Sequence, residues 1–370
     1  MKKIILCTGG TGGHIFPMIA LYEELKKNHN VKIVTDQRAL KYLDLKQDLT
    51  IIPAESPYRK KGMFHFIKSI FIIGLSVIKS FFILISYRPN VVVGSGGYVS
   101  YPILVVAKLL KIKFFIYETN SVLGRVNQIF LPHCHKLLTG YERIHSVPEK
   151  FKDKMNYVGQ LVRSQFMRLS EDGKMFGKTV QKGDSLNILI LGGSQGAKIF
   201  GDKLPEKFLS LSKKKVNLTI NQQVQEDQLA SVGKYYEKNI IASNINDKEI
   251  LLTFMLFTFS NQIEQFVKKA DLVICRSGSS TLSELASAIK PFIAVPLKNS
   301  LDNHQYQNAK YYADQDCCWL VEENDEMSFK IEKIIENVFK TRSFLKNKVE
   351  NLIKLKKGNP IQNFINQITN

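Results

Sequence analysis

The stretch KIILCTGGTGGHIFPMIALYEEL, residues 3–25, decides the fold class at the start of the chain. Residues 4–6 form a short apolar run that is typical of a buried strand. Glycines and His14 follow, and apolar residues then recur at helical spacing. Pro17 lies in the first turn of that helix, where a missing N–H has no cost. The stretch therefore predicts a strand, a glycine loop and a helix.

The glycine loop predicts an anion site. Its N–H groups and the N-terminus of the following helix together attract negative charge, most often a phosphate. A tight turn with positive φ also uses glycine, but it needs only one or two, whereas Gly9, Gly10, Gly12 and Gly13 all occur here. His14 at the junction of loop and helix is therefore a candidate functional residue rather than an ordinary structural histidine.

Length, charge and cysteine content limit the function classes. The chain has 370 residues, enough for two domains, and 44% of them are hydrophobic, as in ordinary globular proteins. A formal charge of +19 points to nucleic acid, an anionic membrane surface or phosphorylated substrates as partners. Five cysteines without a CxxC spacing disfavour a disulfide framework or a zinc site and fit a reducing cytosol. The apolar run before the glycines is too short for a signal peptide.

The opening pattern returns along the chain. Valines at 91–93 precede Gly94, Gly96 and Gly97, and after a polar stretch at 165–186, which reads as a linker, NILILGGSQGAKIF repeats the pattern from Asn187. Further strands are expected at 113–117, 272–275 and 292–295, the first ending in the polar residues Glu118, Thr119 and Asn120. Strands that alternate with helices in both halves predict two doubly wound α/β domains, with a cleft between them for two substrates.

Residues 64–87 predict one long apolar helix inside a region, 56–117, that contains no Asp or Glu. Its polar residues fall within one stripe of about 120° at helical spacing: Lys68, Ser69, Ser76, Lys79, Ser80 and Ser86. We expect this helix to contact a core on one side and an anionic membrane on the other, the membrane side including Ile73, Val77 and Phe81. A core helix with a narrow solvent face is the alternative, and a spanning helix is a third.

Several other motifs fit less well. No glycine loop continues with the Gly-Lys-Ser/Thr of a Walker A motif. Ile15 occupies the third glycine position of a dinucleotide-binding GxGxxG, although Asp36 stands where a ribose-binding acid would be. Residues 314–316, DQD, are read as a solvated loop rather than as the metal site of some sugar transferases. A nucleic-acid-binding protein would mix its basic residues with exposed aromatics, which here gather in one apolar helix.

Six motifs in a fixed order carry a more specific signal: GGTGGHIFP, GSGGYVSYP, ETNSVLGRVN, LGGSQGA, RSGSSTLSE and DNHQYQNA. From about residue 3 to residue 310 the chain resembles the MurG family, N-acetylglucosaminyltransferases that complete the lipid-linked precursor of peptidoglycan. The resemblance implies a GT-B fold, two Rossmann-like domains facing a cleft, and an inverting transfer from UDP-GlcNAc to the C4 hydroxyl of lipid I. It implies no cofactor and no metal in the transfer.

The resemblance also assigns substrate contacts. It places the donor mainly in the C-terminal half, with Ser194 at the diphosphate and the segment from Ser279 to Glu284 at diphosphate and ribose, where Glu284 accepts hydrogen bonds from ribose hydroxyls. Gln305 is expected to bind sugar hydroxyls, and the backbone at Ser260 to bind uracil. The expected donor contacts in full are Thr11, Gly12, Gly13, Asn120, Arg163, Ser194, Ser260, Arg276, Ser279, Ser280, Thr281, Leu282, Ser283, Glu284 and Gln305.

The transfer needs a base for the attacking hydroxyl and stabilisation of the departing diphosphate. We expect His14 to be the base, with Glu118 as the second candidate, and Arg276 to stabilise the leaving group. The acceptor's own diphosphate is expected at the N-terminal glycine loops, at Gly10, Gly96, Gly97 and Tyr98.

The sequence departs from the family pattern at several positions. The usual His-Glu-Gln-Asn is Tyr-Glu-Thr-Asn at 117–120, and the usual Asn-Pro-Val-Arg is Gln-Leu-Val-Arg at 160–163. The usual His-Gln-x-Gly is Asn-Gln-Gln-Val at 221–224. Ile289 and Lys290 stand where a glycine usually precedes Pro291. The glycines and the expected direct donor contacts are present, so we still expect activity.

The expected organisation follows from these assignments. We expect an N-terminal acceptor and membrane-associating domain over 1–163 and a UDP-GlcNAc-binding domain over 164–344, with a helix at about 345–370 that packs back on the first domain. The expected partners are UDP-GlcNAc, lipid I and an anionic membrane surface, with other cell-wall synthesis proteins as further candidates and no nucleic acid. The expected location is the cytoplasmic face of the plasma (inner) membrane. A UDP-sugar epimerase of the same fold and an NAD-dependent oxidoreductase are the alternatives.

Overall fold

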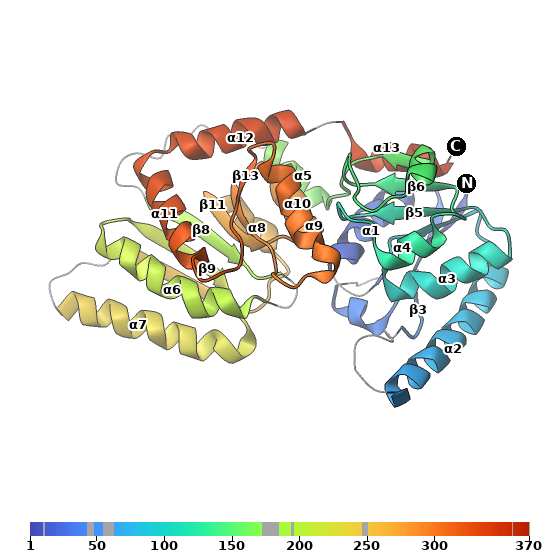
Figure 1. Ribbon diagram of the computed structural model, residues 1–370, viewed down its shortest axis with the longest axis horizontal. Coiled ribbons are helices and arrows are strands. Elements are labelled where there is room, and N and C mark those ends of the chain that lie inside the picture. Colours follow the sequence, from blue (N-terminus) through green and yellow to red (C-terminus); the bar gives the residue numbers. More distant parts are fainter. Residues whose placement is uncertain are drawn as a thin grey trace. The chain divides into compact units, whose positions relative to one another are not determined.

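The computed structural model describes residues 1–9, 12–42, 48–54, 63–171, 185–193, 196–245, 251–356 and 358–369. The chain forms two compact units (Figure 1). Unit 1 comprises Met1–Arg163 together with Lys357–Asn370, and unit 2 comprises Ser164–Lys356.

Unit 1 is built on a parallel sheet of seven strands in the order β3-β2-β1-β4-β5-β6-β7. Its central strands are buried apolar runs, as expected for a parallel sheet that is covered on both faces. The strands are β1 (Lys3–Cys7), β2 (Asn30–Thr35), β3 (Leu49–Ile51), β4 (Val91–Gly94), β5 (Phe114–Glu118), β6 (Lys136–Thr139) and β7 (Met155–Tyr157). The helices are α1 (Gly12–Leu25), α2 (Met63–Tyr87), α3 (Gly97–Leu109), α4 (Arg125–Phe130) and α13 (Pro360–Thr369), with single 3-10 turns η1 (Gln37–Tyr42) and η2 (Glu149–Lys154).

Unit 2 repeats this plan with a six-stranded parallel sheet in the order β10-β9-β8-β11-β12-β13. Its strands are β8 (Leu186–Leu191), β9 (Leu218–Gln223), β10 (Leu252–Phe257), β11 (Leu272–Arg276), β12 (Phe292–Val295) and β13 (Cys318–Leu320). Its helices are α5 (Ser164–Glu171), α6 (Lys198–Lys213), α7 (Leu229–Ile245), α8 (Ile263–Lys269), α9 (Ser279–Ser287), α10 (His304–Ala313), α11 (Met327–Lys340) and α12 (Ser343–Leu355), with 3-10 turns η3 (Glu226–Gln228) and η4 (Leu301–Asn303). The prediction of two doubly wound parallel-sheet units is confirmed.

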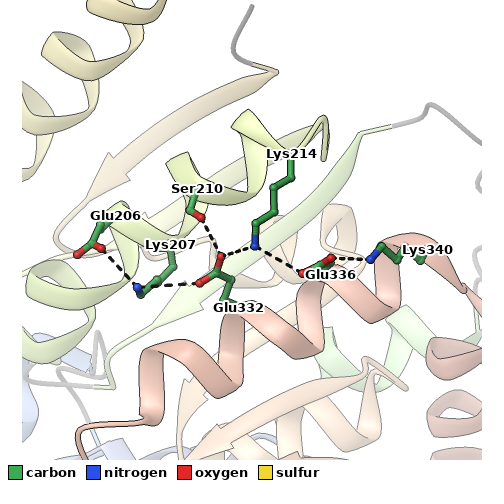
Figure 2. A network of polar contacts seen from close by, with 7 residues as sticks. All are labelled: Glu206, Lys207, Ser210, Lys214, Glu332, Glu336 and Lys340. Atoms are coloured by element: carbon green, nitrogen blue, oxygen red, sulfur yellow. Dashed lines mark hydrogen bonds and ion pairs between the residues drawn. The ribbon is translucent and has the colours of Figure 1, made fainter. Parts of the chain in front are cut away.

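The interface of α6 and α11 in unit 2 carries a polar network (Figure 2). Glu332 of α11 is only 7% exposed and accepts hydrogen bonds from Ser210 Oγ on α6 at 2.8 Å and from Nζ of Lys214, the residue directly after α6, at 3.0 Å. Lys214 also lies 3.7 Å from Glu336, which pairs with Lys340 at 2.5 Å. These contacts raise the pKa of Lys214 and lower the pKa of Glu336. The network joins α11 to α6 and the residue after it, and it contains none of the predicted site residues.

The long apolar helix α2 buries small polar side chains and exposes large apolar ones, the reverse of an ordinary amphipathic helix. It packs beside α3 (Figure 1), and the serines of its predicted polar stripe, Ser69, Ser76 and Ser80, are wholly buried. Ser76 Oγ donates to the carbonyl of Ile72 at 2.8 Å, and Ser80 Oγ donates to that of Ser76 at 2.6 Å, so that their hydroxyls are satisfied without water. Small side chains allow two helices to approach closely. Three serines of the predicted stripe therefore face inward, whereas Lys68, Lys79 and Ser86 of the same stripe are exposed.

The outward face of α2 is apolar. Eight of its large side chains are 40–66% exposed, namely Ile67, Ile70, Phe71, Leu75, Ile78, Phe81, Phe82 and Ile85. Among the three residues predicted to meet a membrane, Phe81 belongs to this face. Ile73 is half-buried and Val77 packs against the core of unit 1. These two residues therefore lie nearer the interior than the prediction placed them. By length and composition alone, one helix among the described residues, Ile67–Tyr87, could cross a membrane.

Two other predictions about segments differ from the structure. The start of the stretch interpreted as a linker, 165–171, is helical, because Phe166 and Leu169 are spaced for one helix face and are both buried. The single helix expected at about 345–370 is two helices, α12 in unit 2 and α13 in unit 1. Gly358, with a φ of 57°, lies between them, and Pro360 is the first residue of α13, where proline needs no hydrogen-bonded N–H.

Candidate functional site

The carboxyl ends of β1 and β4 bring two glycine loops of unit 1 together. A Cβ on Gly9 would lie 2.3 Å from the Cγ2 of Val99, so no side chain fits at this position. A Cβ on Gly97 would lie 3.7 Å from the carbonyl oxygen of Gly9, which makes the two loops neighbours. Gly96 and Gly97 have φ values of 88° and 74°, and α3 begins at Gly97. Successive N–H groups of this kind, at a helix N-terminus, form a concave site for an anion.

Two hydroxyl groups join these loops and fix the start of α1. Thr8 Oγ1 donates a hydrogen bond to the carbonyl oxygen of His14 at 2.9 Å. Ser95 Oγ donates to Thr8 Oγ1, also at 2.9 Å, and both hydroxyl-bearing residues are at most 1% exposed. His14 is half-buried in the first turn of α1. The sequence prediction included His14 but not Thr8 and Ser95. These two residues could have been found, because each places a hydroxyl side chain directly after a buried strand.

Glu118 at the end of β5 organises the loop that follows it. Its Oε1 accepts hydrogen bonds from the backbone N (2.9 Å) and Nδ2 (3.2 Å) of Asn120. Its Oε2 accepts from the N of Gly124 at 2.8 Å and from Nδ2 of Asn127 at 2.7 Å. Burial raises the pKa of Glu118, and these four N–H groups oppose that rise by favouring the carboxylate.

The surroundings of Glu118 favour a positioning role over that of a base. The residue is 1% exposed and both of its oxygens already accept hydrogen bonds from the protein. It positions Asn120, a predicted donor contact, and Asn127, which lies against Gly96: a Cβ on Gly96 would meet the Nδ2 of Asn127 at 3.2 Å. Asn127 was missed because only the fold brings its helix to the glycine loop.

Four departures from the family pattern lie in contact with one another in unit 1. Tyr117 Oη accepts a hydrogen bond from the N of Leu161 at 3.0 Å and donates to the carbonyl of Gly159 at 3.2 Å. Gln160 Nε2 donates to the carbonyl of Thr119 at 3.0 Å. The changed residues therefore connect the end of β5 to the segment that leads to Arg163, and they support the site without lining it.

Arg163 and Tyr98 complete the predicted residues of unit 1 that the structure describes. The guanidinium carbon of Arg163 lies 3.9 Å from the ring centroid of Phe16 on α1, which is a cation–π contact. A Cβ on Gly12 would lie 2.8 Å from the Cε2 of the same ring, so Phe16 separates Arg163 from the start of the helix. Tyr98 is half-buried in the first turn of α3.

In unit 2 the N-terminus of α9 is the main candidate for a phosphate site. The helix starts at Ser279, and a Cβ on the preceding Gly278 would meet no atom within 4 Å, so this end of the helix is open to approach. Ser279, Ser280 and Glu284 are at most 7% exposed, and Thr281 is half-buried.

Two residues of the predicted α9 segment have internal roles. Ser283 Oγ donates to the carbonyls of Ser279 at 2.9 Å and Ser280 at 3.1 Å. Leu282 is wholly buried. Its buried side chain therefore belongs to the interior of unit 2, and only its backbone is left as a predicted substrate contact.

Arg276 at the end of β11 has its own partner. Its Nη1 lies 2.5 Å from Oε2 of Glu323 and 3.4 Å from the carbonyls of Val295 and Pro296, and its side chain is 10% exposed. Its guanidinium also lies over Phe200, 5.0 Å from the ring centroid. A buried and neutralised guanidinium is poorly placed to stabilise a leaving diphosphate. Arg276 joins the ends of β11 and β12 to the loop that carries Glu323, and its predicted contact with the leaving group stays a prediction.

The remaining predicted donor contacts lie around the carboxyl edge of the second sheet. Ser260 is half-buried and its Oγ accepts from the N of Gln262 at 3.1 Å. The side-chain oxygen of Gln305 accepts from the N of Leu297 at 3.0 Å. Ile289, at the usual glycine position, has a φ of 54°, the left-handed conformation that favours glycine. Predicted residues Gly10, Thr11 and Ser194 lie outside the described residues, whereas Gly12 and Gly13 open α1.

Comparisons with known proteins identify the family. The model of the glycosyltransferase family 28 N-terminal domain matches residues 4–139, and that of the C-terminal domain matches residues 187–368. A relative from Rickettsia bellii is named UDP-N-acetylglucosamine--N-acetylmuramyl-(pentapeptide) pyrophosphoryl-undecaprenol N-acetylglucosamine transferase. It is 35% identical over 360 residues, which cover 96% of each chain.

Two solved structures show that the fold is shared. The crystal structure of Acinetobacter baumannii MurG superposes with a TM-score of 0.73 at 23% identity, covering 100% of this chain and 99% of that one. UDP-GlcNAc 2-epimerase from Neisseria meningitidis, bound to UDP-GlcNAc, gives a TM-score of 0.63 at 14% identity, covering 97% and 95%. The fold alone thus accommodates both transfer and epimerisation.

Proposed function

Because the chain belongs to glycosyltransferase family 28, we propose that it transfers N-acetylglucosamine from UDP-GlcNAc to undecaprenyl-diphospho-N-acetylmuramyl-pentapeptide (lipid I). The product is lipid II, the disaccharide precursor of peptidoglycan, and UDP is released. The observation that carries the proposal is 35% identity over 96% of both chains to a relative named for this transfer.

In the proposed reaction the C4 hydroxyl of N-acetylmuramic acid attacks C1 of N-acetylglucosamine. A new C–O bond forms while the bond from C1 to the UDP oxygen breaks, so the configuration at C1 inverts. The proton of the attacking hydroxyl passes to the imidazole of His14, and UDP leaves with the bonding electron pair. The contact of Thr8 Oγ1 with the backbone of His14 supports this role, because it fixes the turn that carries the imidazole.

We place the donor on unit 2. The open N-terminus of α9 offers backbone N–H groups to the diphosphate of UDP-GlcNAc. The carboxylate of Glu284 accepts from ribose hydroxyls, and the amide nitrogen of Gln305 is directed to the sugar while its oxygen holds Leu297. Arg276 acts through its ion pair with Glu323, which keeps the ends of β11 and β12 in register.

The transfer is tested with labelled UDP-GlcNAc and a lipid I analogue in detergent. We expect a labelled lipid-linked disaccharide and one UDP for each sugar transferred. Omission of the acceptor is the control, because a transferase then leaves the donor intact. Epimerisation of the donor without transfer would overturn the proposal and favour the second enzyme class that shares this fold.

We propose that the exposed face of α2 attaches the protein to the cytoplasmic face of the plasma (inner) membrane as a peripheral protein. Phe71 and Phe82 are each 66% exposed on this face, and apolar side chains with adjacent basic residues favour an anionic lipid surface. Lys108 and Lys111 lie exposed at the end of α3, the helix beside α2. Residues 1–163 hold 24 Lys and Arg against 10 Asp and Glu, a formal charge of +14.

We expect Phe71→Ser with Phe82→Ser to lower binding to anionic vesicles at least about tenfold, because each exposed ring contributes apolar area to the contact. Co-sedimentation with vesicles of phosphatidylglycerol and phosphatidylethanolamine measures this. Val77→Ser is the matched control on the inner face: it lowers the unfolding midpoint and leaves vesicle binding of the folded protein unchanged. Wild-type vesicle binding by the double phenylalanine variant would contradict the assignment of this face.

A further inference from the structure

Asp36 and Arg38 form a paired unit at the carboxyl end of β2. Asp36 is 3% exposed, and its Oδ1 accepts from the backbone N of Arg38 at 2.9 Å. Its Oδ2 accepts from Nε of Arg38 at 3.1 Å and from Nη2 at 2.5 Å. The buried carboxylate therefore fixes the orientation of the guanidinium, while the arginine side chain remains 46% exposed.

This pair borders the two glycine loops. A Cβ on Gly9 would lie 3.3 Å from Oδ2 of Asp36 on one side, and the carbonyl of Gly9 borders Gly97 on the other. The sheet order β2-β1-β4 places these three strand ends side by side. Arg38, the loop at Gly9 and the N-terminus of α3 thus form one continuous edge of unit 1.

The chemistry of this edge suits a phosphate better than a ribose hydroxyl. In dinucleotide-binding folds an acid at the end of the second strand accepts from a ribose hydroxyl, and an arginine there accommodates a phosphate. Asp36 is already occupied by three N–H groups, so it offers little to a hydroxyl. A guanidinium carries five N–H donors, and its planar edge matches phosphate oxygens. With Nε and Nη2 held by Asp36, the exposed part of Arg38 presents the remaining donors.

We propose that Arg38 binds the diphosphate of the polyprenyl-diphosphate acceptor, next to Gly96, Gly97 and the N-terminus of α3. The inference rests on the proposed function and extends it by a residue. The acceptor is favoured over the nucleotide donor because Arg38 belongs to unit 1, which also carries the exposed apolar helix α2 beside α3. The diphosphate of this acceptor is joined to a prenyl tail that stays in the membrane, so the diphosphate must bind to the unit that contacts the lipid. Asp36 is the positioning residue for Arg38.

Steady-state kinetics with Arg38→Gln test the assignment. We expect the KM for the lipid acceptor to rise roughly 10- to 100-fold, since charge-assisted hydrogen bonds to phosphate are lost. The KM for UDP-GlcNAc and the affinity for UDP stay unchanged. Arg38→Lys restores part of the loss, because it returns the charge without the planar fork. Arg143→Gln is the matched control, an equal change of charge at an exposed position of unit 1.

Calorimetric titration with farnesyl diphosphate, a short prenyl diphosphate, gives a readout independent of turnover. Arg38→Gln weakens this binding about tenfold or more, Arg143→Gln keeps the wild-type affinity, and farnesol binds all three proteins alike. Wild-type farnesyl diphosphate affinity and acceptor KM in Arg38→Gln would overturn the inference, as would a loss of UDP affinity instead. If Arg38-dependent binding persists while the wild type transfers no sugar, the inference stands and the proposed function fails.

Discussion

We expect His14→Ala to lower kcat by roughly 10²- to 10⁴-fold, the usual contribution of a positioned general base. The affinity for UDP stays unchanged, because the proposed nucleotide site belongs to unit 2, whereas His14 belongs to unit 1. Transfer kinetics and titration with UDP measure the two quantities separately.

The control for His14→Ala is His133→Ala. His133 is exposed before the amino end of β6 and contacts Lys108 Nζ at 2.9 Å, so its loss should leave turnover intact. His14→Gln adds a second comparison, since it keeps a polar side chain but provides no base. Near-normal turnover in either His14 variant would remove the imidazole from the proton transfer. The Thr8 contact would then serve only to hold the loop.

The second large effect concerns Glu118. We expect Glu118→Ala to lower the free energy of unfolding of unit 1 by about 3 kcal/mol or more, because four N–H donors lose their acceptor inside the protein. Glu118→Gln should fall between this variant and the wild type, since an amide keeps one acceptor oxygen and turns an NH₂ group toward the other donors. Urea unfolding monitored by circular dichroism ranks the three proteins.

Hydrogen exchange shows which part of the protein the substitution Glu118→Ala destabilises. The amides of Asn120 and Gly124, which donate to its carboxylate, should lose protection in Glu118→Ala. The amides of Leu189 and Ile190 in β8 of unit 2 are the internal reference, and Glu23→Ala, a change at an exposed carboxylate of α1, is the matched control. Loss of turnover in Glu118→Gln with full protection at Asn120 and Gly124 would instead support a base and contradict the positioning role.

Local sequence patterns were sufficient for the architecture. Apolar runs at 4–6, 91–93 and 272–275 became central strands, and the glycines after them became loops at one edge of each sheet. These signals are short-range, because a strand buried on both faces and a turn without room for a side chain each need particular residues within a few positions. The family motifs added the fold type and the order of the candidate site residues.

The partners of charged and polar side chains could not be predicted in this way. Glu323 neutralises Arg276 from 47 positions away, and Asn127 reaches Glu118 only because α4 packs beside the glycine loop. A carboxylate next to a candidate site has the same sequence signal whether it faces a substrate or the interior. Its role depends on which N–H groups the fold brings to it, and those come from other elements.

The helix α2 shows which properties the sequence determines and which depend on the tertiary structure. Its length, its apolar composition and its single polar stripe were all determined by the sequence from 64 to 87. Which face lies inward was decided by the tertiary structure: Ser69, Ser76 and Ser80 are buried where α2 packs on unit 1, Ser76 also donating to the carbonyl of Pro53, and the large apolar side chains remain outside. Periodicity defines the faces of a helix, but close packing against a neighbour selects the one that is buried.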